Sequence, residues 1–124
     1  MTRINVVPVE ELHPKHLVAE YREIVRVFAL VRKRVEAKKN VCWDIPIEYT
    51  LGAGHVKFFF NKLFYVLCRY KELTKEMIRR GYKPNPVPEE VLCDGIPRMY
   101  FFDYEPTEHA ISINRQRIKD RMPK

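Results

Sequence analysis

The sequence lacks the side-chain patterns of disulfide-rich and metal-dependent proteins. Its three cysteines, Cys42, Cys68 and Cys93, are odd in number and far apart, and they form no C-x-x-C pair. No cysteine and histidine cluster has the spacing of a zinc site, which argues against a disulfide framework and a structural metal. We therefore expect a protein of a reducing compartment that uses no metal and no cofactor.

Long apolar segments are lacking as well. No run approaches the roughly 18 apolar residues of a transmembrane helix, and residues 1–12 contain no apolar stretch of the kind that precedes a secretory cleavage site. The alternating apolar and polar runs that predict β-strands are also missing. These absences predict an intracellular protein without a membrane partner.

The sequence does contain enough apolar material for a core, and an excess of positive charge. It has 124 residues, 46% of them hydrophobic, and a formal net charge of +7. This length suits a single domain, 1–124, which we expect to be a monomer. Segment 82–105 is acidic, so the positive charge belongs to the rest of the chain. A polyanion such as nucleic acid is one interpretation of the charge, and a solvated surface is the other.

Three segments have the pattern of amphipathic helices, namely 14–38, 55–80 and a third that starts near residue 107. Apolar residues recur along the first two at three- and four-residue steps, which predicts one buried face for each of them, and the third carries three isoleucines among basic residues. The residues expected in the core are Leu17, Tyr21, Ile24, Val25, Phe28, Val31 and Val35, then Phe59, Phe60, Leu63, Leu67, Tyr70, Leu73 and Met77, then Ile111, Ile113 and Ile118. The predicted fold is all-α, a compact single domain of three main helices with long connecting loops.

The polar face of the first helix combines cations with a carboxylate. Arg22 and Arg26 are four residues apart and stack along the helix axis, a spacing that suits neighbouring phosphates, and Glu23 lies between them. A carboxylate on a DNA-facing surface is a candidate for acid–base work on a sugar or base. The alternative is an ordinary surface ion pair of Glu23 with either arginine, worth under about 1 kcal/mol.

The N-terminus offers a second chemical group. Thr2 is small, so Met1 is expected to be removed, which leaves the α-amine of Thr2 free. An α-amino group has a pKa of about 7.7–8.0, so roughly a tenth of it is neutral at pH 7, far more than for a lysine. Such an amine can attack a sugar aldehyde carbon and form an imine.

Several motifs along the chain occur in the same order in a known family. They are TRIN at the start, HLVAEYRE followed by RVF, LGAGHVKFFFNKL, RRGY, DY-x-P and AIS-x-x-R. In these the chain resembles the phage pyrimidine-dimer DNA glycosylase/AP lyase family, also called the phage endonuclease V family. The resemblance implies an all-α fold in which the N-terminal amine lies beside the first helix.

The resemblance also implies roles for individual residues. Thr2 would be the nucleophile, through its backbone nitrogen, and Glu23 the catalytic carboxylate. The positions that match DNA-contacting residues of the family are Arg3, His16, Arg22, Arg26, Arg115 and Lys119. Arg117 is an added cation without a family counterpart, which we interpret as ordinary phosphate binding or a solvated face.

The activity implied by the resemblance is repair of damaged double-stranded DNA. The enzyme would excise the 5′ pyrimidine of a cyclobutane dimer through an imine with Thr2 and then nick the strand by β-elimination, without a metal. The sequence departs from the phage enzyme at Lys15, where that enzyme has a neutral amide, and after RMPK, where that enzyme has an aromatic-rich tail. Abasic sites and oxidised bases are therefore alternative lesions. An abasic-site lyase and a noncatalytic module that binds or bends damaged DNA are alternative functions.

Overall fold

The structure is a computed structural model that describes residues 4–37, 45–52 and 54–122. Within these ranges the chain is helical and forms no strand, which confirms the all-α prediction. The helices are α1 (Pro14–Glu23), α2 (Arg26–Glu36), α3 (His55–Phe58), α4 (Leu63–Arg79), α5 (Glu89–Cys93) and α6 (Glu108–Asp120), with 3-10 turns at Val9–Glu11 and Arg98–Tyr100. An isolated antiparallel bridge joins Lys62 to Phe101.

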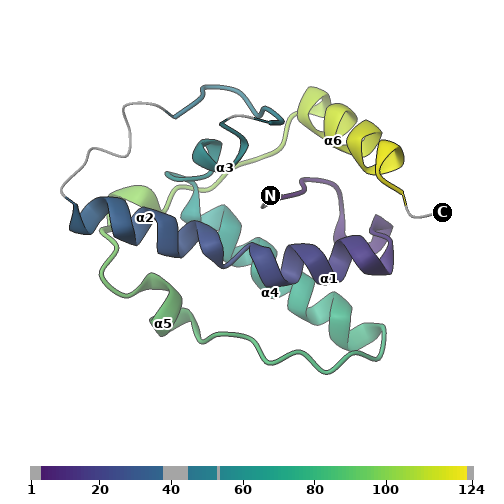
Figure 1. The fold of residues 1–124 in the computed structure, drawn as a ribbon, viewed down its shortest axis with the longest axis horizontal. Coiled ribbons are helices and arrows are strands. Elements are labelled where there is room, and N and C mark those ends of the chain that lie inside the picture. The colour runs from purple at the N-terminus through teal and green to yellow at the C-terminus, as the bar shows by residue number, and fades with distance from the viewer. Residues whose placement is uncertain (1–3, 38–44, 53, 123–124) are drawn as a thin grey trace.

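The first predicted helix is a rod of two helices, so the prediction of one unbroken helix is wrong at Ile24 and Val25. Both residues keep right-handed helical angles, but the N–H of Val27 bonds to the carbonyl oxygen of Ile24, 3.2 Å away, which tightens the turn. β-Branched side chains crowd the preceding turn of a helix, and the local tightening places fully buried Ile24 in the core. Because the backbone stays helical, α1 and α2 still run nearly in line (Figure 1).

The second predicted helix is also divided, into α3 and α4. Phe58, Phe59 and Phe60 are all buried, and one straight helix does not bury three consecutive side chains on a single face. The chain therefore turns after α3, and Lys62 leaves the helical region with φ −121° and ψ 38°. The ammonium group of Lys62 donates to the carbonyl oxygen of Phe58 at 2.9 Å, and burial lowers its pKa.

The ends of α4 and α6 follow the sequence signals. Thr107 caps α6, because its hydroxyl oxygen accepts a hydrogen bond from the N–H of Ala110 at 3.0 Å. Gly81 ends α4 with a positive φ of 94°, and Tyr82 N–H bonds back to the carbonyl oxygen of Met77 at 2.9 Å. The bond from Tyr82 to Met77 belongs to a Schellman motif, for which glycine is the favoured residue at the position of Gly81.

Segment 82–105 was predicted as a loop, and the structure adds the short helix α5 to it. Arg32 on α2 holds this helix, since its guanidinium donates to the carbonyl oxygens of Val91, Leu92 and Asp94 at 2.6–3.0 Å. Carbonyl groups at a helix C-terminus lack partners inside the helix, and a cation there is favourable. The Pro-rich segment is thereby tied to the rod.

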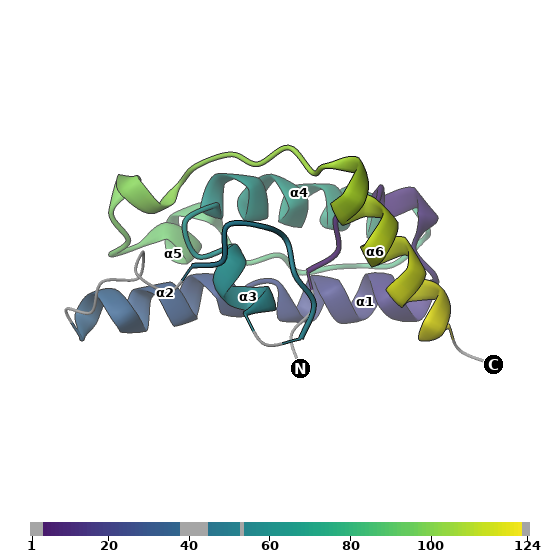
Figure 2. The same cartoon turned by 90° about the horizontal axis from the view of Figure 1, so that it is seen from above.

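The helices surround the N-terminal segment of the chain. α1 packs on α4, and α2 packs on α5. α6 crosses at one end of the rod, and the segment before α1 passes between α6 and the rod (Figure 1 and Figure 2). The predicted apolar stripes of the rod and of 55–80 lie in the core, either buried or packed against it. Ile111, Ile113 and Ile118 are partly buried, and the fully buried positions of α6 are Ala110 and Asn114.

Candidate active site

The first described residue is held by a histidine. The N–H of Ile4 donates to Nε2 of buried His55 at 2.9 Å, and Nδ1 of His55 lies 2.8 Å from the carbonyl oxygen of Thr50. Since Nε2 accepts a hydrogen bond, the proton of the neutral ring is on Nδ1, which donates to Thr50. Ile4 is itself fully buried, so the start of the chain is anchored by packing as well.

Helix α6 holds the next residues through one amide. Oδ1 of Asn114, which is fully buried, accepts hydrogen bonds from the N–H groups of Val6 at 2.7 Å and Val7 at 3.2 Å. Its Nδ2 donates to Oδ1 of Asn5 at 2.8 Å. One side chain thus pairs three polar groups of an extended segment that has no sheet partner among the described residues, which meets the bonding requirement of buried backbone.

A buried ion pair completes this network. Nε and Nη2 of Arg69 on α4 donate to the two carboxylate oxygens of Glu20 on α1 at 2.8 and 3.1 Å, and Asn5 Nδ2 donates to Glu20 at 2.8 Å. A further Arg69 nitrogen donates to the carbonyl oxygen of Val7. Burial by itself lowers the pKa of Arg69, but the charge and hydrogen bonds of Glu20 raise it overall. The network joins α1, α4 and the N-terminal segment.

Beside this network lies a pocket of about 200 Å³, which we call the Glu23 pocket. It is lined by Asn5, His16, Ala19, Glu20, Glu23, Arg117, Ile118 and Arg121. Glu23 is half-buried, and no hydrogen bond or ion pair joins its carboxylate to another described residue. The surface ion pair with Arg22 or Arg26, our alternative interpretation, is therefore not formed between these described residues.

Two further groups of the Glu23 pocket are buried without a partner. Nε2 of His16 donates to the carbonyl oxygen of Arg121 at 3.2 Å, which connects the start of α1 to the end of α6. Nδ1 of His16 and Nε of Arg117 have no hydrogen-bond partner among the described residues. Buried polar groups are normally paired, and unpaired ones at a pocket indicate a place that a ligand can fill.

Comparison with known families identifies the chain. The family model described as pyrimidine dimer DNA glycosylase matches residues 1–89. The chain belongs to the pyrimidine dimer DNA glycosylase family. It is thus a DNA repair enzyme of the glycosylase class that acts on damaged DNA. The match includes Asn5, His16, Glu20 and Glu23, whereas α6, which supplies the other wall of the Glu23 pocket, lies outside it.

The glycosylase places the other predicted residues away from the Glu23 pocket. Arg22 and Arg26 are exposed on the rod, at the end of α1 and the start of α2. Arg115 forms an ion pair with Glu11 at 2.8 Å and, with Lys119, lines a separate hollow on α6. Thr2 and Arg3, the predicted nucleophile and one DNA contact, lie outside the described residues.

Sequence reasoning missed several residues of the Glu23 pocket. Glu20 and Asn5 were not singled out, and the sequence offered no sign that a glutamate on the first helix would be buried against Arg69. Arg117 was interpreted only as ordinary phosphate binding or a solvated face, and Arg121 was given no role. Arg121 follows the last residue of α6, so its place beside Arg117 depends on how that helix ends.

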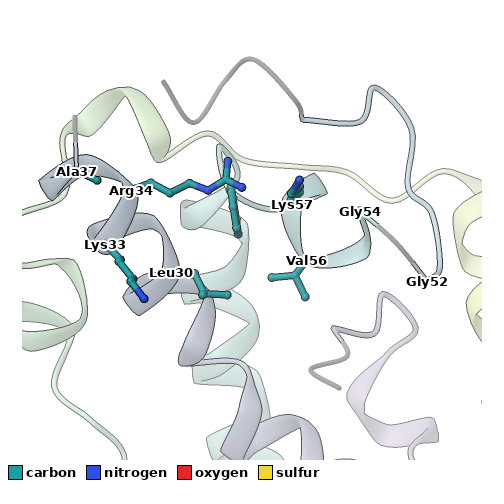
Figure 3. A pocket seen from close by; sticks show the side chains of 9 residues that line it. Leu30, Lys33, Arg34, Ala37, Gly52, Gly54, Val56 and Lys57 are labelled. Carbon is teal, nitrogen blue, oxygen red and sulfur yellow. The ribbon is translucent and has the colours of Figure 1, made fainter. Parts of the chain in front are cut away.

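A larger hollow of the glycosylase lies between α2 and α3, with a volume of about 460 Å³ (Figure 3). Leu30 and Val56 point toward one another across it, and the Arg34 guanidinium lies 4.8 Å from the ring centre of Phe60. The described residues that line it include cations but no carboxylate. Among the described residues, a carboxylate for acid–base chemistry is thus present in the smaller Glu23 pocket and not in the larger hollow.

The described part of the glycosylase contains no group of three or more His, Cys, Asp or Glu side chains placed to hold a metal ion. Cys68 and Cys93 are free thiols whose pKa is raised, first of all by burial. Cys42 lies outside the described residues. Among the described helices, none is long and apolar enough to cross a membrane.

Proposed function

We propose that this glycosylase is bifunctional, a DNA N-glycosylase and an AP lyase that uses the α-amine of Thr2 after removal of Met1. Its substrate is the 5′ pyrimidine of a cyclobutane dimer in double-stranded DNA. The observation that carries the proposal is the carboxylate of Glu23, which has no hydrogen bond or ion pair with a described residue and shares a pocket with Asn5 of the anchored N-terminal segment.

Chain length supports a nucleophile close to this carboxylate. Thr2 lies three positions before Asn5, and a chain spans at most about 11 Å over three such steps. Asn5 is held by Glu20 and Asn114, so this limit is measured from a fixed point at the pocket. An amine within this reach can meet a sugar bound at Glu23 without any movement of the helices.

The proposed chemistry has two stages. The Thr2 amine attacks C1′ of the damaged sugar, the N-glycosidic bond breaks, and its electron pair leaves with the base, which takes up a proton. The attached amine then loses a proton, the C1′–O4′ bond of the sugar ring breaks, O4′ becomes a hydroxyl, and a protonated imine remains at C1′. A base, which we assign as Glu23, then takes a proton from C2′, and the bond from C3′ to its phosphate breaks. Before that step, the negative charge of Glu23 stabilises the positive charge on the sugar.

The exposed cations supply the proposed DNA contacts. Arg22 and Arg26 on the rod, and Arg115 and Lys119 on α6, are exposed at the surface, and Arg115 also forms the ion pair with Glu11. Contacts of this kind bind the phosphate backbone regardless of sequence and weaken as salt rises. Arg3 and His16 complete the proposed set.

The test is borohydride trapping on duplex DNA. With ultraviolet-irradiated duplex, the protein with Thr2 at its N-terminus, verified by mass spectrometry, should form a covalent adduct and cut the strand. Acetylation at near-neutral pH, where the α-amine reacts ahead of the lysines, should abolish both. Thr2→Ser keeps the amine and should retain trapping.

The outcomes separate the alternatives. Full activity after acetylation would exclude the amine mechanism. Adducts on abasic duplex but none on irradiated duplex would indicate an abasic-site lyase. Salt-sensitive binding without adduct or cutting on either duplex would indicate a noncatalytic damage-binding module.

A further inference from the structure

Two positive charges enter the Glu23 pocket from the C-terminal end of α6. Arg117 lies in the last turn of that helix and Arg121 directly after it, and both line the pocket. Neither lies within the residues matched by the family model. The two arginines are thus a feature of this chain that neither the family match nor the resemblance accounts for.

The Arg117 side chain is placed in the pocket but not paired. It is half-buried, its Nε is fully buried without a partner, and no hydrogen bond or ion pair joins its side chain to a described residue. An unpaired buried donor costs about 1–3 kcal/mol, and more when it is charged. The two Nη groups of Arg117 are not buried in this way and also bond to no described residue, so they are the donors that an anion in the pocket can reach.

The carboxylates of the pocket do not neutralise Arg117. Glu20 is fully used by Arg69 and Asn5, and Glu23 has no ion pair with any described residue. The pocket therefore keeps one negative and two positive side-chain charges apart from each other. Such a site fits a ligand that itself carries separated charges.

We propose that Arg117, with Arg121 beside it, binds the phosphodiester that adjoins the damaged sugar, while Glu23 faces the sugar. The inference rests on the proposed function, which supplies a sugar that becomes positive next to a phosphate that stays negative. A guanidinium matches phosphate because its fork of N–H donors bonds two oxygens at once. Arg117 is thus a binding and positioning residue at the lesion.

The experiment measures binding to a duplex that carries one tetrahydrofuran abasic analogue, which no amine can convert to an imine. Dissociation constants of the unmodified protein and of Arg117→Gln are compared over a series of salt concentrations, and again with undamaged duplex. We expect Arg117→Gln to bind the abasic analogue at least about tenfold more weakly and to reduce the salt slope by about one. The loss should be smaller on undamaged duplex.

Matched variants control for charge and folding. Arg98→Gln removes the same charge from an exposed residue in the 82–105 segment and should change neither quantity beyond error. Arg117→Lys keeps the charge but loses the fork, so it should keep the salt slope and recover only part of the affinity. Urea unfolding should give the same stability for all three variants.

The results distinguish the inference from the proposed function. If the unmodified protein cuts irradiated DNA while Arg117→Gln keeps its affinity and salt slope, the phosphate assignment is wrong and the function stands. Equal losses on damaged and undamaged duplex would also overturn it, because the contact would not be at the lesion. If the unmodified protein forms no adduct, the proposed function fails, but the Arg117 comparison still decides whether this pocket binds phosphate.

Discussion

Glu20 and Glu23 are three residues apart on one helix and line the same pocket, yet their surroundings are opposite. The Glu20 side chain is 1% exposed and receives hydrogen bonds from Arg69 and Asn5. Glu23 is half-buried and has no ion pair or hydrogen bond among the described residues. The first carboxylate is used in holding helices together, and the second is available to a ligand.

This difference shows how the fold separates stability from chemistry. A carboxylate enclosed by a guanidinium and an amide has its bonding capacity filled, and proton transfer to it would neutralise it and leave a buried cation unpaired. A carboxylate at a pocket wall can approach a sugar without breaking any internal bond. The predictions below test this separation.

Replacing Glu23 should abolish cutting without unfolding the protein. We expect Glu23→Gln to lower the rate of cutting irradiated duplex by about 100-fold to 10,000-fold, the range typical of a lost general acid or base. Its free energy of unfolding should change by less than about 0.5 kcal/mol. Binding to damaged duplex should persist, and rapid cutting by the variant would contradict the assignment.

Replacing Glu20 should have the opposite effect. Glu20→Gln leaves the buried Arg69 without a counter-charge, so we expect a loss of about 3–5 kcal/mol in the free energy of unfolding, measured in urea. Glu36→Gln, at an exposed glutamate near the end of the same rod, is the control and should stay within about 0.5 kcal/mol. Equal stability of the two variants would mean that the Glu20 pair does not support the fold.

Asn114 tests the other end of the buried network. Asn114→Ala leaves the N–H groups of Val6 and Val7 and the amide oxygen of Asn5 without their partner. We expect a loss of about 1–3 kcal/mol in stability. Gln116→Ala, which removes an exposed amide from the same helix, should have little effect. If Asn114→Ala also loses borohydride trapping under conditions where it stays folded, anchoring of the N-terminal segment matters for the nucleophile.

A third carboxylate, Glu76, gives the smallest effect and a pH dependence. Hydrogen bonds from Arg79 and then Arg80 lower its pKa from 4.5 to about 2, although burial of the carboxylate acts in the opposite direction. Because the folded pKa is depressed, this contribution to stability is present above about pH 4.5 and is lost as the pH falls towards 2. Unfolding free energy measured from pH 5 to 2.5 should therefore fall less steeply for Glu76→Gln than for the unmodified protein. Parallel curves would contradict the prediction.

Local signals predicted much of the helical structure. Thr107 and Gly81 mark helix ends in the sequence, and both act there through bonds to their own neighbours. The apolar stripes predicted the buried faces for the same reason, since side-chain spacing along a helix is a local property. The breaks at Ile24–Val25 and after Phe58 were missed. At these breaks consecutive side chains are buried against different neighbouring elements, and the sequence does not say which elements lie around them.

The limit of prediction from the sequence is clearest at the Glu23 pocket. Arg115 and Arg117 are both cations of α6, and sequence reasoning favoured Arg115 for DNA binding because of the family resemblance. In the structure Arg115 pairs with Glu11 at the surface and Arg117 lines the pocket, and the DNA contact of Arg115 stays a prediction. Side chains two positions apart on a helix point in directions that differ by about 200°. The role of each cation therefore depends on which elements its face of the helix contacts.

The sequence by itself determined the helical class, the helix ends marked by Thr107 and Gly81, the basic character and, through its motifs, the family. These follow from local spacing, composition and the order of residues. Tertiary structure alone decided which of two glutamates on one helix is enclosed and which is open, and which arginine of α6 lies beside it. The residues that bond to Glu20 and to the N-terminal segment, such as Arg69, Asn5 and Asn114, come from segments up to 109 residues apart. Only folding brings them together.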